Sequence, residues 1–565
     1  MQGNMEKVLK KRASTPSFVS QSQLVLAGFE TPFSQKLIKT NRWVVLAHLI
    51  PWDEVCNVYT KQVGISHTGR PPVSPRVVIG SLIIKHMCDL DDRETVAQIS
   101  ENMYMQYFLG YSSFTSEEPF DASLFVEFRL RMGLKQINAI NEKVHALYQE
   151  MTRVPEQKNN NDTDQPGPDN QDTTDTVTGV VAAPPETITH KGRVLCDATA
   201  CPQDIAYPTD LGLLSGAREK TEELIDVLYV ASLHLKKPRT YRNTARKEFL
   251  KIAQKKQKTK ASIRRGVGKQ LRYLGRNLRS IDKLLDKCPY FPLDARQQKY
   301  LMVVHTLYEQ QKKMFDAKTH SVEDRIVSIH QPHVRPIVRG KTNSKVEFGA
   351  KVHVSLVDGY AFLDELNWNA FNEGNHLMAY VEQYRNRFGF YPEEVLADQI
   401  YCSRDNRKQL KGIGIKLLAK PLGRPPAVKI QHLRPGERNP IEGKFGQAKT
   451  AYGLDNIKAR LKNTSESWIA CIFLVLNLVK LAGVAFFCLL LKKTDKSFSA
   501  MTQLMAKLQL ICLDVIAQIP FSTNQKIWLF WSFSADPILA LWLILPLTLA
   551  GPQKASLAAC STSIL

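Results

Sequence analysis

The sequence predicts an α/β protein preceded by an all-α domain, and three observations lead to this fold class. Residues 20–150 place apolar side chains at helical spacing, residues 191–480 alternate short apolar strands with helices, and one internal segment concentrates positive charge. The chain has 565 residues, of which 44% are hydrophobic and 23% charged. This is a globular composition, and the length is sufficient for two or three domains.

The N-terminal domain, residues 20–150, is expected to be helical. Ser74 and Pro75 begin one helix, a second follows from Asp92, and a third runs through DASLFVEFRLRMG. Three short helices joined tightly are compatible with a helix-turn-helix module that binds DNA. They are equally compatible with a helical bundle that has no role in DNA binding, and the pattern leaves both interpretations open.

Residues 151–190 are expected to form a disordered acidic linker. The stretch PEQKNNNDTDQPGPDNQDTTDTVTGVVAAPPETITH is polar, contains many acidic side chains and is interrupted by prolines. It has too few apolar residues to bury a core, so no secondary structure is predicted for it.

Several strands follow the linker, and two of them are expected to end on an aspartate. RVLCDATA has the apolar core of a buried strand that ends at Asp197, and EVLAD gives a short strand that ends at Asp398. RIVSIH, VEFGAKVHVSL, YAFLDEL and GIKLLA supply four more strands. The Asp-Gly pair at positions 358 and 359 predicts a hairpin between two of these.

The stretch RNPIEGKFGQAK predicts a helix that carries one acid among cations. Asn439 is expected to cap this helix and Pro440 to begin it. Glu442 and Lys449 then share one face, with Arg438 just ahead of the first turn. A solvated surface helix with a stray acid is the alternative interpretation of this pattern.

A basic helical insertion is expected at about residues 220–320. Within residues 236–287, 19 Lys and Arg residues stand against three acidic ones. Apolar residues recur there every three or four positions, which predicts an amphipathic helix with basic flanks. Such one-sided charge favours nucleic acid, because binding releases counterions from the phosphates. The residues expected to bind DNA in this segment are Arg264, Arg265, Lys269, Arg272, Arg276 and Arg279.

The net charge indicates which class of partner the protein binds, and the cysteines indicate the cellular compartment. The net charge of +22 indicates a polyanionic partner, usually nucleic acid, with an anionic membrane as the rival. Ten cysteines without regular spacing indicate free thiols in a reducing compartment, and no structural zinc is expected. The N-terminus lacks the apolar region of a secretory signal. The protein is therefore expected in the cytoplasm, associated with the nucleoid.

Two apolar runs, residues 469–491 and 527–550, reach the length of about 20 residues that spans a bilayer. The first carries Asn477 and Lys480 in mid-run, and an aspartate and a proline break the second. Because polar groups are costly inside a membrane, buried helices are expected and membrane association is not. The role of the hydrophobic C-terminal tail, residues 481–565, stays open.

Three acids are candidates for a metal site: Asp197, Asp398 and Glu442. Mg²⁺ takes oxygen ligands, commonly carboxylates, phosphate and water. A two-metal site clamps the attacking and leaving oxygens of a phosphodiester. Each acid alone has an ordinary structural interpretation, and the nearby Asp204 and Asp210 are interpreted as structural residues.

Four blocks of the sequence resemble DDE transposases of bacterial insertion sequences. They are VLCDATACPQDIAYPTDLGLLSGAREKTEELID, FGAKVHVSLVDGYAFLDELNWNAFNEGNHL, YPEEVLADQIYCSRDNRKQLK and RNPIEGKFGQAK. They occur in the family's order over about residues 190–480. The helical N-terminal domain resembles the DNA-binding module that such transposases carry.

The resemblance implies a ribonuclease H-like catalytic domain, with a mixed sheet flanked by helices. The family's catalytic acids, which are its metal ligands, fall by position on Asp197, Asp398 and Glu442. A family pattern of Tyr, Arg, Glu and Lys also places Arg438 and Lys449 on the DNA end. Pro435 stands where that pattern has Tyr, which puts one DNA contact in doubt and leaves the metal ligand intact.

The resemblance also implies a reaction and its partners. Metal-dependent hydrolysis at the end of the element frees a 3′-OH, which then attacks target DNA. Two Mg²⁺ ions are expected, with Mn²⁺ as a substitute. The implied partners are double-stranded DNA, as terminal inverted repeats and as target, and a second copy of the chain in a dimer on DNA. Three alternatives stay open: a related nuclease without strand transfer, a DNA-binding protein whose catalysis has lapsed, and a membrane-anchored protein.

Overall fold

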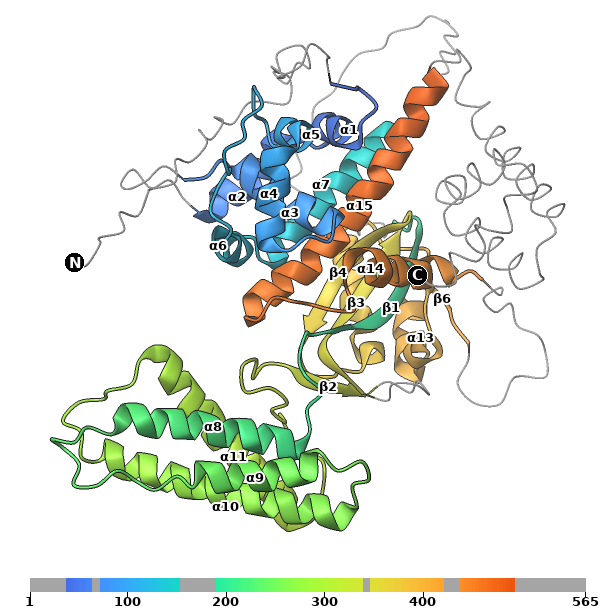
Figure 1. The fold of residues 1–565 in the computed structure, drawn as a ribbon. Helices are drawn as coiled ribbons and strands as arrows, with labels where there is room; N and C mark the ends of the chain where they lie inside the picture. The colour runs from blue at the N-terminus through green and yellow to red at the C-terminus, as the bar shows by residue number, and fades with distance from the viewer. Residues whose placement is uncertain (1–36, 64–71, 153–188, 339–345, 421–435, 493–565) are drawn as a thin grey trace, which may run out of the picture.

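The computed structural model describes residues 37–63, 72–152, 189–338, 346–420 and 436–492. Most of the expected acidic linker, the second apolar run and most of the C-terminal tail lie outside these residues. Figure 1 shows the N-terminal helices next to a sheet and a helix bundle that extends away from that sheet.

A mixed six-stranded sheet, counted over the described residues, forms the centre of the domain that follows residue 190. β3 pairs with β1, β2 and β4, and the sheet continues from β1 to β5 and then β6. β1 is antiparallel to β3 but parallel to β5, and β5 is parallel to β6. The strands are β1 (Arg193–Pro202), β2 (Arg335–Val338), β3 (Val346–Val357), β4 (Tyr360–Asn367), β5 (Glu394–Leu396) and β6 (Lys416–Leu418).

The predicted hairpin between β3 and β4 is confirmed. Asp358 and Gly359 form its turn, and both have positive φ, 52° and 75°. A two-residue turn of type I′ requires this backbone conformation, which Gly adopts freely and Asp tolerates. The two strands pair directly on either side of the turn, from Val357 and Tyr360 onward.

The N-terminal helices pack on one long helix near the other end of the described chain, α15 (Lys462–Lys492). α15 contacts α1, α3, α6 and α7 and also lies against β4. The N-terminal helices and the sheet therefore share one hydrophobic core. The helices are α1 (Arg42–Leu49), α2 (Trp52–Val63), α3 (Pro75–Met87), α4 (Asp92–Glu101), α5 (Met103–Phe108), α6 (Leu124–Arg131) and α7 (Leu134–Thr152). The three helices that the sequence predicts are α3, α4 and α6.

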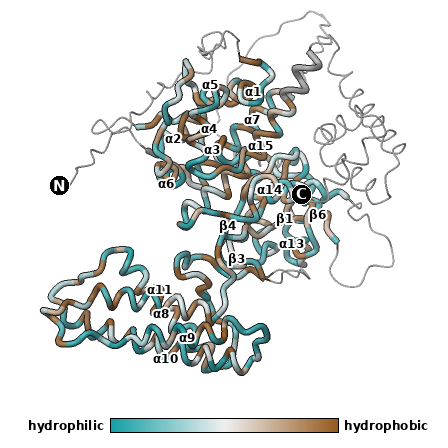
Figure 2. Tube along the Cα trace, in the orientation of Figure 1, coloured by the Kyte–Doolittle hydropathy of each residue, from teal (hydrophilic) through white to brown (hydrophobic). Residues whose placement is uncertain are grey.

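α15 contains the first apolar run and is buried in this core. The segment Lys462–Val484 is long and apolar enough to cross a membrane. However, 72% of its most apolar 18-residue stretch is buried inside the protein. Asn477, with 0% exposure, accepts the backbone N–H of Ala361 and donates to the carbonyl oxygen of the same residue, both at 2.8 Å. Figure 2 shows the hydrophobic residues where α15 passes the N-terminal helices. The expected buried helix is confirmed over its described side chains.

Four helices between β1 and β2 form the bundle. α10 lies in contact with the other three, and its apolar positions from Val267 to Ile281 are buried in a core that belongs to the bundle. The predicted amphipathic helix is thus confirmed, although Ile263 in its first turn is 37% exposed. The helices are α8 (Asp210–Leu228), α9 (Arg242–Ala253), α10 (Lys260–Leu285) and α11 (Ala295–Ala317).

The remaining helices surround the sheet. α12 (Leu377–Phe388) precedes β5, and α13 (Arg404–Gly412) connects β5 to β6. α14 (Asn439–Tyr452) packs against β1 and α15. Two short 3₁₀ helices, η3 (Glu373–His376) and η4 (Gln399–Tyr401), contact each other.

One predicted strand is wrong. RIVSIH, residues 325–330, forms no strand, and β2 lies a few residues further along. Ile326 and Ile329 bury their side chains in the core of the bundle. The side-chain oxygen of Gln310 on α11 accepts the backbone N–H of Ile326 at 2.9 Å. The apolar run therefore packs against helices, and a side chain of α11, not a neighbouring strand, binds the N–H of Ile326.

Three predicted boundaries also differ from the structure. The sequence predicts that the EVLAD strand ends at Asp398, whereas β5 ends at Leu396. The sequence predicts that β1 ends at Asp197, whereas the strand continues to Pro202 because β3 pairs with it from Leu195 to Pro202. The sequence predicts Asn439 as the cap of α14, whereas Asn439 is the first residue of the helix. Arg438 occupies the capping position and makes no side-chain cap bond, because a guanidinium group has no acceptor for the free N–H groups of the first turn.

Candidate active site

Asp197 lies in the middle of the central strand of the sheet. β1 has β3 on one side and β5 on the other, and Asp197 pairs with Val354. Because side chains alternate along a strand, Asp197 faces away from its neighbour Cys196, which is buried. The carboxylate accepts the backbone N–H of Ala198 at 2.8 Å, and the side chain is 20% exposed.

Asp398 follows β5, the strand next to β1. The two strands are parallel, and Leu195 pairs with Leu396. Asp197 and Asp398 each come two residues later, so they lie at the same level of the sheet. Asp398 is the capping residue of η4, and its Oδ1 accepts the backbone N–H of Gln399 at 2.7 Å. Its side chain is 56% exposed, so the carboxylate is accessible to a ligand.

Arg438 joins these two aspartates. Its Nη2 donates to Oδ2 of Asp197 at 3.0 Å, and its Nη1 lies 3.3 Å from Oδ1 of Asp398. Arg438 directly precedes α14, and α14 packs against β1. One guanidinium group therefore binds acids that come from two strands. The sequence pattern assigns Arg438 to DNA and gives no sign of this contact with the acids.

Glu442 lies in the first turn of α14, and its side chain is exposed. Burial raises the pKa of Asp197, Arg438 and the N–H of Ala198 lower it, and the negative charges of Asp398 and Glu442 raise it further. The net result is a pKa above the ordinary value for an aspartate. Asp398 and Glu442 are therefore each close enough to Asp197 to act on its carboxylate electrostatically.

The acids do not form a closed metal site in the described part of the chain. Within that part, no three or more His, Cys, Asp or Glu side chains are grouped so that they could hold a metal ion. The chemistry of the three acids nevertheless fits Mg²⁺ or Mn²⁺, because all their donors are carboxylate oxygens, which hard cations prefer. A cationic group, the guanidinium of Arg438, already lies between Asp197 and Asp398.

Lys449 lies in the last turn of α14. It is seven residues after Glu442, so the two side chains lie on the same side of the helix. α14 thus carries Glu442 and Lys449 together and begins directly after Arg438, as the sequence pattern predicts.

A buried polar network lies behind Asp197, on the opposite face of the sheet. The side chain of Asp364 is fully buried, binds Arg387 at 2.6 Å, lies 2.9 Å from Nδ1 of His353, and accepts a hydrogen bond from Ser355. Burial raises the pKa of Asp364, but Arg387, His353 and Ser355 more than offset this effect. The pKa of Asp364 is therefore below its ordinary value.

This network supports the strand that carries Asp197. Ser355 pairs with Cys196 across β3 and β1, and their Oγ and Sγ atoms are 4.0 Å apart. The ring of His353 stacks on Tyr380 of α12, with 3.5 Å between the ring centroids. A search of the sequence for carboxylates at strand ends misses these residues. The polar side chains at alternate positions of the apolar strand β3 are the signal that could have found them.

The basic residues predicted on α10 divide into two sets. Arg265, Arg272 and Arg279 are exposed and follow one another at intervals of seven residues, which is close to two helical turns. They form a stripe along one side of the helix, called the arginine stripe below. By contrast, Lys269 forms an ion pair with Glu248 at 2.5 Å, and Arg276 lies over the ring of Tyr241, 4.5 Å from its centroid.

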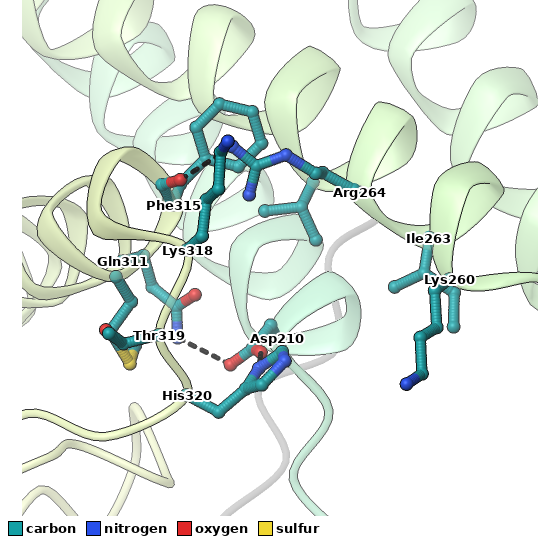
Figure 3. A pocket seen from close by; sticks show the side chains of 11 residues that line it. Asp210, Lys260, Ile263, Arg264, Gln311, Phe315, Lys318, Thr319 and His320 are labelled. Atoms are coloured by element: carbon teal, nitrogen blue, oxygen red, sulfur yellow. Dashed lines mark hydrogen bonds and ion pairs between the residues drawn. The ribbon is translucent and has the colours of Figure 1, made fainter.

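Arg264 belongs to the second set and lines a cavity of about 520 Å³ at one end of the bundle. Figure 3 shows its guanidinium over the ring of Phe315, 4.2 Å from the centroid, where it also donates to the carbonyl oxygen of that residue at 2.9 Å. Asp210 accepts hydrogen bonds from Gln311 at 2.9 Å and Arg325 at 2.7 Å. These bonds support the structural interpretation of Asp210. The other basic side chains that line the cavity are Lys260, Lys318 and His320.

Two segments of the chain match transposase families. Residues 395–479 match the transposase DDE domain, and residues 32–131 match the transposase domain DUF772. The first segment includes Asp398 and Glu442, whereas Asp197 lies outside both segments. The second segment includes the helices from α1 to α6. These matches confirm the resemblance to DDE transposases.

The chain is also similar to the uncharacterized protein ORF8 in the nfe locus of Rhizobium meliloti, with 36% identity over 117 residues. The match covers 20% of this chain and 54% of that protein. The chain thus spans about half the length of this relative. No solved structure matches the chain.

Proposed function

We propose that this chain, which carries two segments of transposase families, is a transposase that binds insertion-sequence ends, cleaves them and transfers the cut strand to target DNA. One observation carries the proposal. Asp197 on β1 and Asp398 after β5 bind the same guanidinium group of Arg438, and Glu442 lies one helical turn further on. Carboxylates from neighbouring elements are the ligands with which proteins hold Mg²⁺ beside a phosphodiester.

The strand order supports a ribonuclease H-like fold for the catalytic domain. β4, β3, β1, β5 and β6 follow one another across the sheet. The first three strands are antiparallel, and the last two run parallel to β1. In this arrangement the first acid is on the central strand and the second follows its neighbour, as the family resemblance implies.

The proposed roles of the side chains follow from their exposure and their anchors. Asp197, Asp398 and Glu442 would hold the metal through carboxylate oxygens. Bound Mg²⁺ would supply a Lewis acid that activates water or a 3′-OH and stabilises charge on the phosphodiester. The exposure of Asp398 and Glu442 leaves this side open to a DNA strand. Arg438 and Lys449 would bind phosphates beside the cut, where a guanidinium can make two parallel hydrogen bonds.

The arginine stripe on α10 supports a second contact with DNA. Three exposed guanidinium groups along one side of a long helix can face one DNA backbone together, and each phosphate contact releases counterions. Because transposition pairs two DNA ends, we assign the active form to a dimer on DNA. The corresponding location is the cytoplasm, together with the nucleoid.

A strand-transfer assay tests this function. The substrate is duplex DNA that carries the inverted repeats flanking the coding region, with a supercoiled plasmid as target. The full-length protein with Mg²⁺ is expected to cut the end and to join its 3′-OH to the plasmid, whereas Asp398→Ala is expected to bind the end and do neither. Cutting without joining would indicate a nuclease. Binding without cutting by the unmodified protein would indicate lapsed catalysis.

A further inference from the structure

We propose that Arg438 occupies the place of a divalent cation between Asp197 and Asp398, and that metal binding at these acids displaces its side chain. The inference rests on the proposed function of the site and extends it. In this view the metal-free protein uses its own guanidinium to hold the acids together. The arrival of the metal frees that guanidinium for a DNA phosphate.

The first support is the geometry of the shared guanidinium. Two different nitrogens of Arg438 reach the two acids, Nη2 to Asp197 at 3.0 Å and Nη1 to Asp398 at 3.3 Å. Oδ1 of Asp197 already accepts the N–H of Ala198, and Arg438 binds the other oxygen, Oδ2. A cation that takes both carboxylates as ligands therefore has to enter beside or in place of the guanidinium group. Arg438 and a metal are therefore competitors for one pair of acids.

The second support is an unsatisfied donor on Arg438 itself. Its Nε is buried and has no hydrogen-bond partner among the described residues. A buried donor without a partner is unfavourable, because it has lost its hydrogen bonds to water. When the side chain binds both acids, one of its five N–H groups is therefore left without a hydrogen bond. An alternative position on a phosphate, which accepts hydrogen bonds from several directions, would relieve this loss.

The third support is the place of Arg438 in the chain. It lies before the first residue of α14, two residues after Gly436, whose φ is +98°. Glu442, by contrast, is inside the helix. The Arg438 side chain can therefore leave the acids without any movement of the helix that carries Glu442.

A purely structural ion pair makes the opposite prediction. If Arg438 only held the acids in position, its removal would let two like charges separate and would weaken metal binding. If Arg438 competes with the metal, its removal empties the place between the carboxylates and strengthens metal binding. The sign of the change in metal affinity therefore distinguishes the two roles.

The experiment measures Mn²⁺ affinity of the full-length protein without DNA, from the electron paramagnetic resonance signal of free Mn²⁺. Arg438→Gln is expected to bind Mn²⁺ about three- to thirtyfold more tightly than the unmodified protein, as expected from the loss of two competing ion pairs. Arg438→Lys is expected to fall between the two, because an ammonium group is a compact charge that does not span both acids as a guanidinium does.

Two further variants make the result specific. Lys411→Gln removes an exposed charge at the end of α13 and is expected to leave Mn²⁺ affinity unchanged. Asp398→Asn is expected to weaken Mn²⁺ binding strongly, both alone and in combination with Arg438→Gln. Thermal unfolding in EDTA shows whether each variant is folded, and added Mn²⁺ is expected to raise the Tm of Arg438→Gln more than that of the unmodified protein.

Equal or weaker Mn²⁺ binding by Arg438→Gln, with Asp398→Asn still weakening it, would overturn the competition and leave the proposed function standing. Absence of Mn²⁺ binding at these acids in every variant would overturn both the competition and the metal site on which the proposed function depends.

Discussion

Arg387 of α12 donates to the fully buried carboxylate of Asp364 at 2.6 Å. This ion pair lies on the face of the sheet opposite to Asp197, so it supports the candidate site from behind. Removing Arg387 leaves the buried carboxylate of Asp364 without its guanidinium partner, with only His353 and Ser355 beside it. We expect Arg387→Met to lower the free energy of unfolding by about 3–5 kcal/mol, measured by urea denaturation.

Arg385→Met is the matched control for this prediction. Arg385 is on the same helix, and its ion pair with Glu382 is longer, at 3.9 Å, and about half exposed. A loss of less than about 1 kcal/mol is expected for it, as for exposed pairs in general. Equal losses in the two variants would show that the buried pair with Asp364 does not stabilise the fold in particular.

The lowered pKa of Asp364 predicts a pH dependence of stability. Its pKa in the folded protein is below the ordinary value of 3.8, so the folded state binds fewer protons at this group than the unfolded state. The carboxylate therefore stabilises the fold above pH 3.8, and this contribution is lost as the pH falls through the lower folded pKa. We expect the stability of the double variant Arg387→Met/Asp364→Asn to depend less on pH below that value. Urea denaturation at a series of acidic pH values measures this, and identical slopes would contradict it.

The hydrogen bonds of Asn477 are expected to stabilise the packing of α15 against β4. Its side chain satisfies both the N–H and the C=O of Ala361 on β4. Asn477→Leu makes the helix more apolar but leaves two buried backbone groups unpaired. We expect a loss of about 2–4 kcal/mol in the free energy of unfolding, whereas Leu478→Met at the next buried position should cost less than about 1.5 kcal/mol. A gain in stability for Asn477→Leu would contradict this prediction. It would show that the hydrogen bonds between α15 and Ala361 of β4 do not stabilise the fold.

The arginine stripe predicts how DNA affinity depends on salt. Replacing Arg265, Arg272 and Arg279 with Gln is expected to weaken binding to duplex DNA. It should also reduce the slope of log K against log salt by about 2.7, if each of the three binds one phosphate. Fluorescence anisotropy at several salt concentrations measures the slope.

The second set of basic residues on α10 supplies the control for the arginine stripe. Lys269 and Arg276 are engaged with Glu248 and Tyr241, so Lys269→Gln with Arg276→Gln should change the slope much less. The same change of slope in both variants would indicate that the bundle attracts DNA only through its net charge.

The sequence predicts the local elements of this fold better than their boundaries. Helical spacing identifies α3, α4 and α10, and the Asp-Gly pair identifies the hairpin of β3 and β4. RIVSIH fails because apolar alternation does not reveal its neighbours: Ile326 packs into the bundle, and Gln310 accepts its backbone N–H. The end of β1 fails for a similar reason, since pairing with β3 carries the strand past Asp197 to Pro202.

In the candidate site, too, the sequence predicts local features but not contacts between distant parts of the chain. The three acids are identifiable because each follows a short apolar run or begins a helix, and because the family resemblance orders them, although Asp197 lies in mid-strand and not at a strand end. The contact of Arg438 with Asp197 and Asp398 joins distant parts of the chain, and no local spacing encodes it. The network around Asp364 is also a tertiary feature, because its members come from β3, β4 and α12.

The most direct test of the central claim is a crystal structure of the protein with Mn²⁺, using anomalous scattering to locate the metal. The account predicts an anomalous peak within bonding distance of carboxylate oxygens of Asp197, Asp398 and Glu442, with the side chain of Arg438 moved away from the two aspartates. A well-ordered structure at saturating Mn²⁺ with no peak at these acids, or with the three carboxylates too far apart to share a metal, would contradict it.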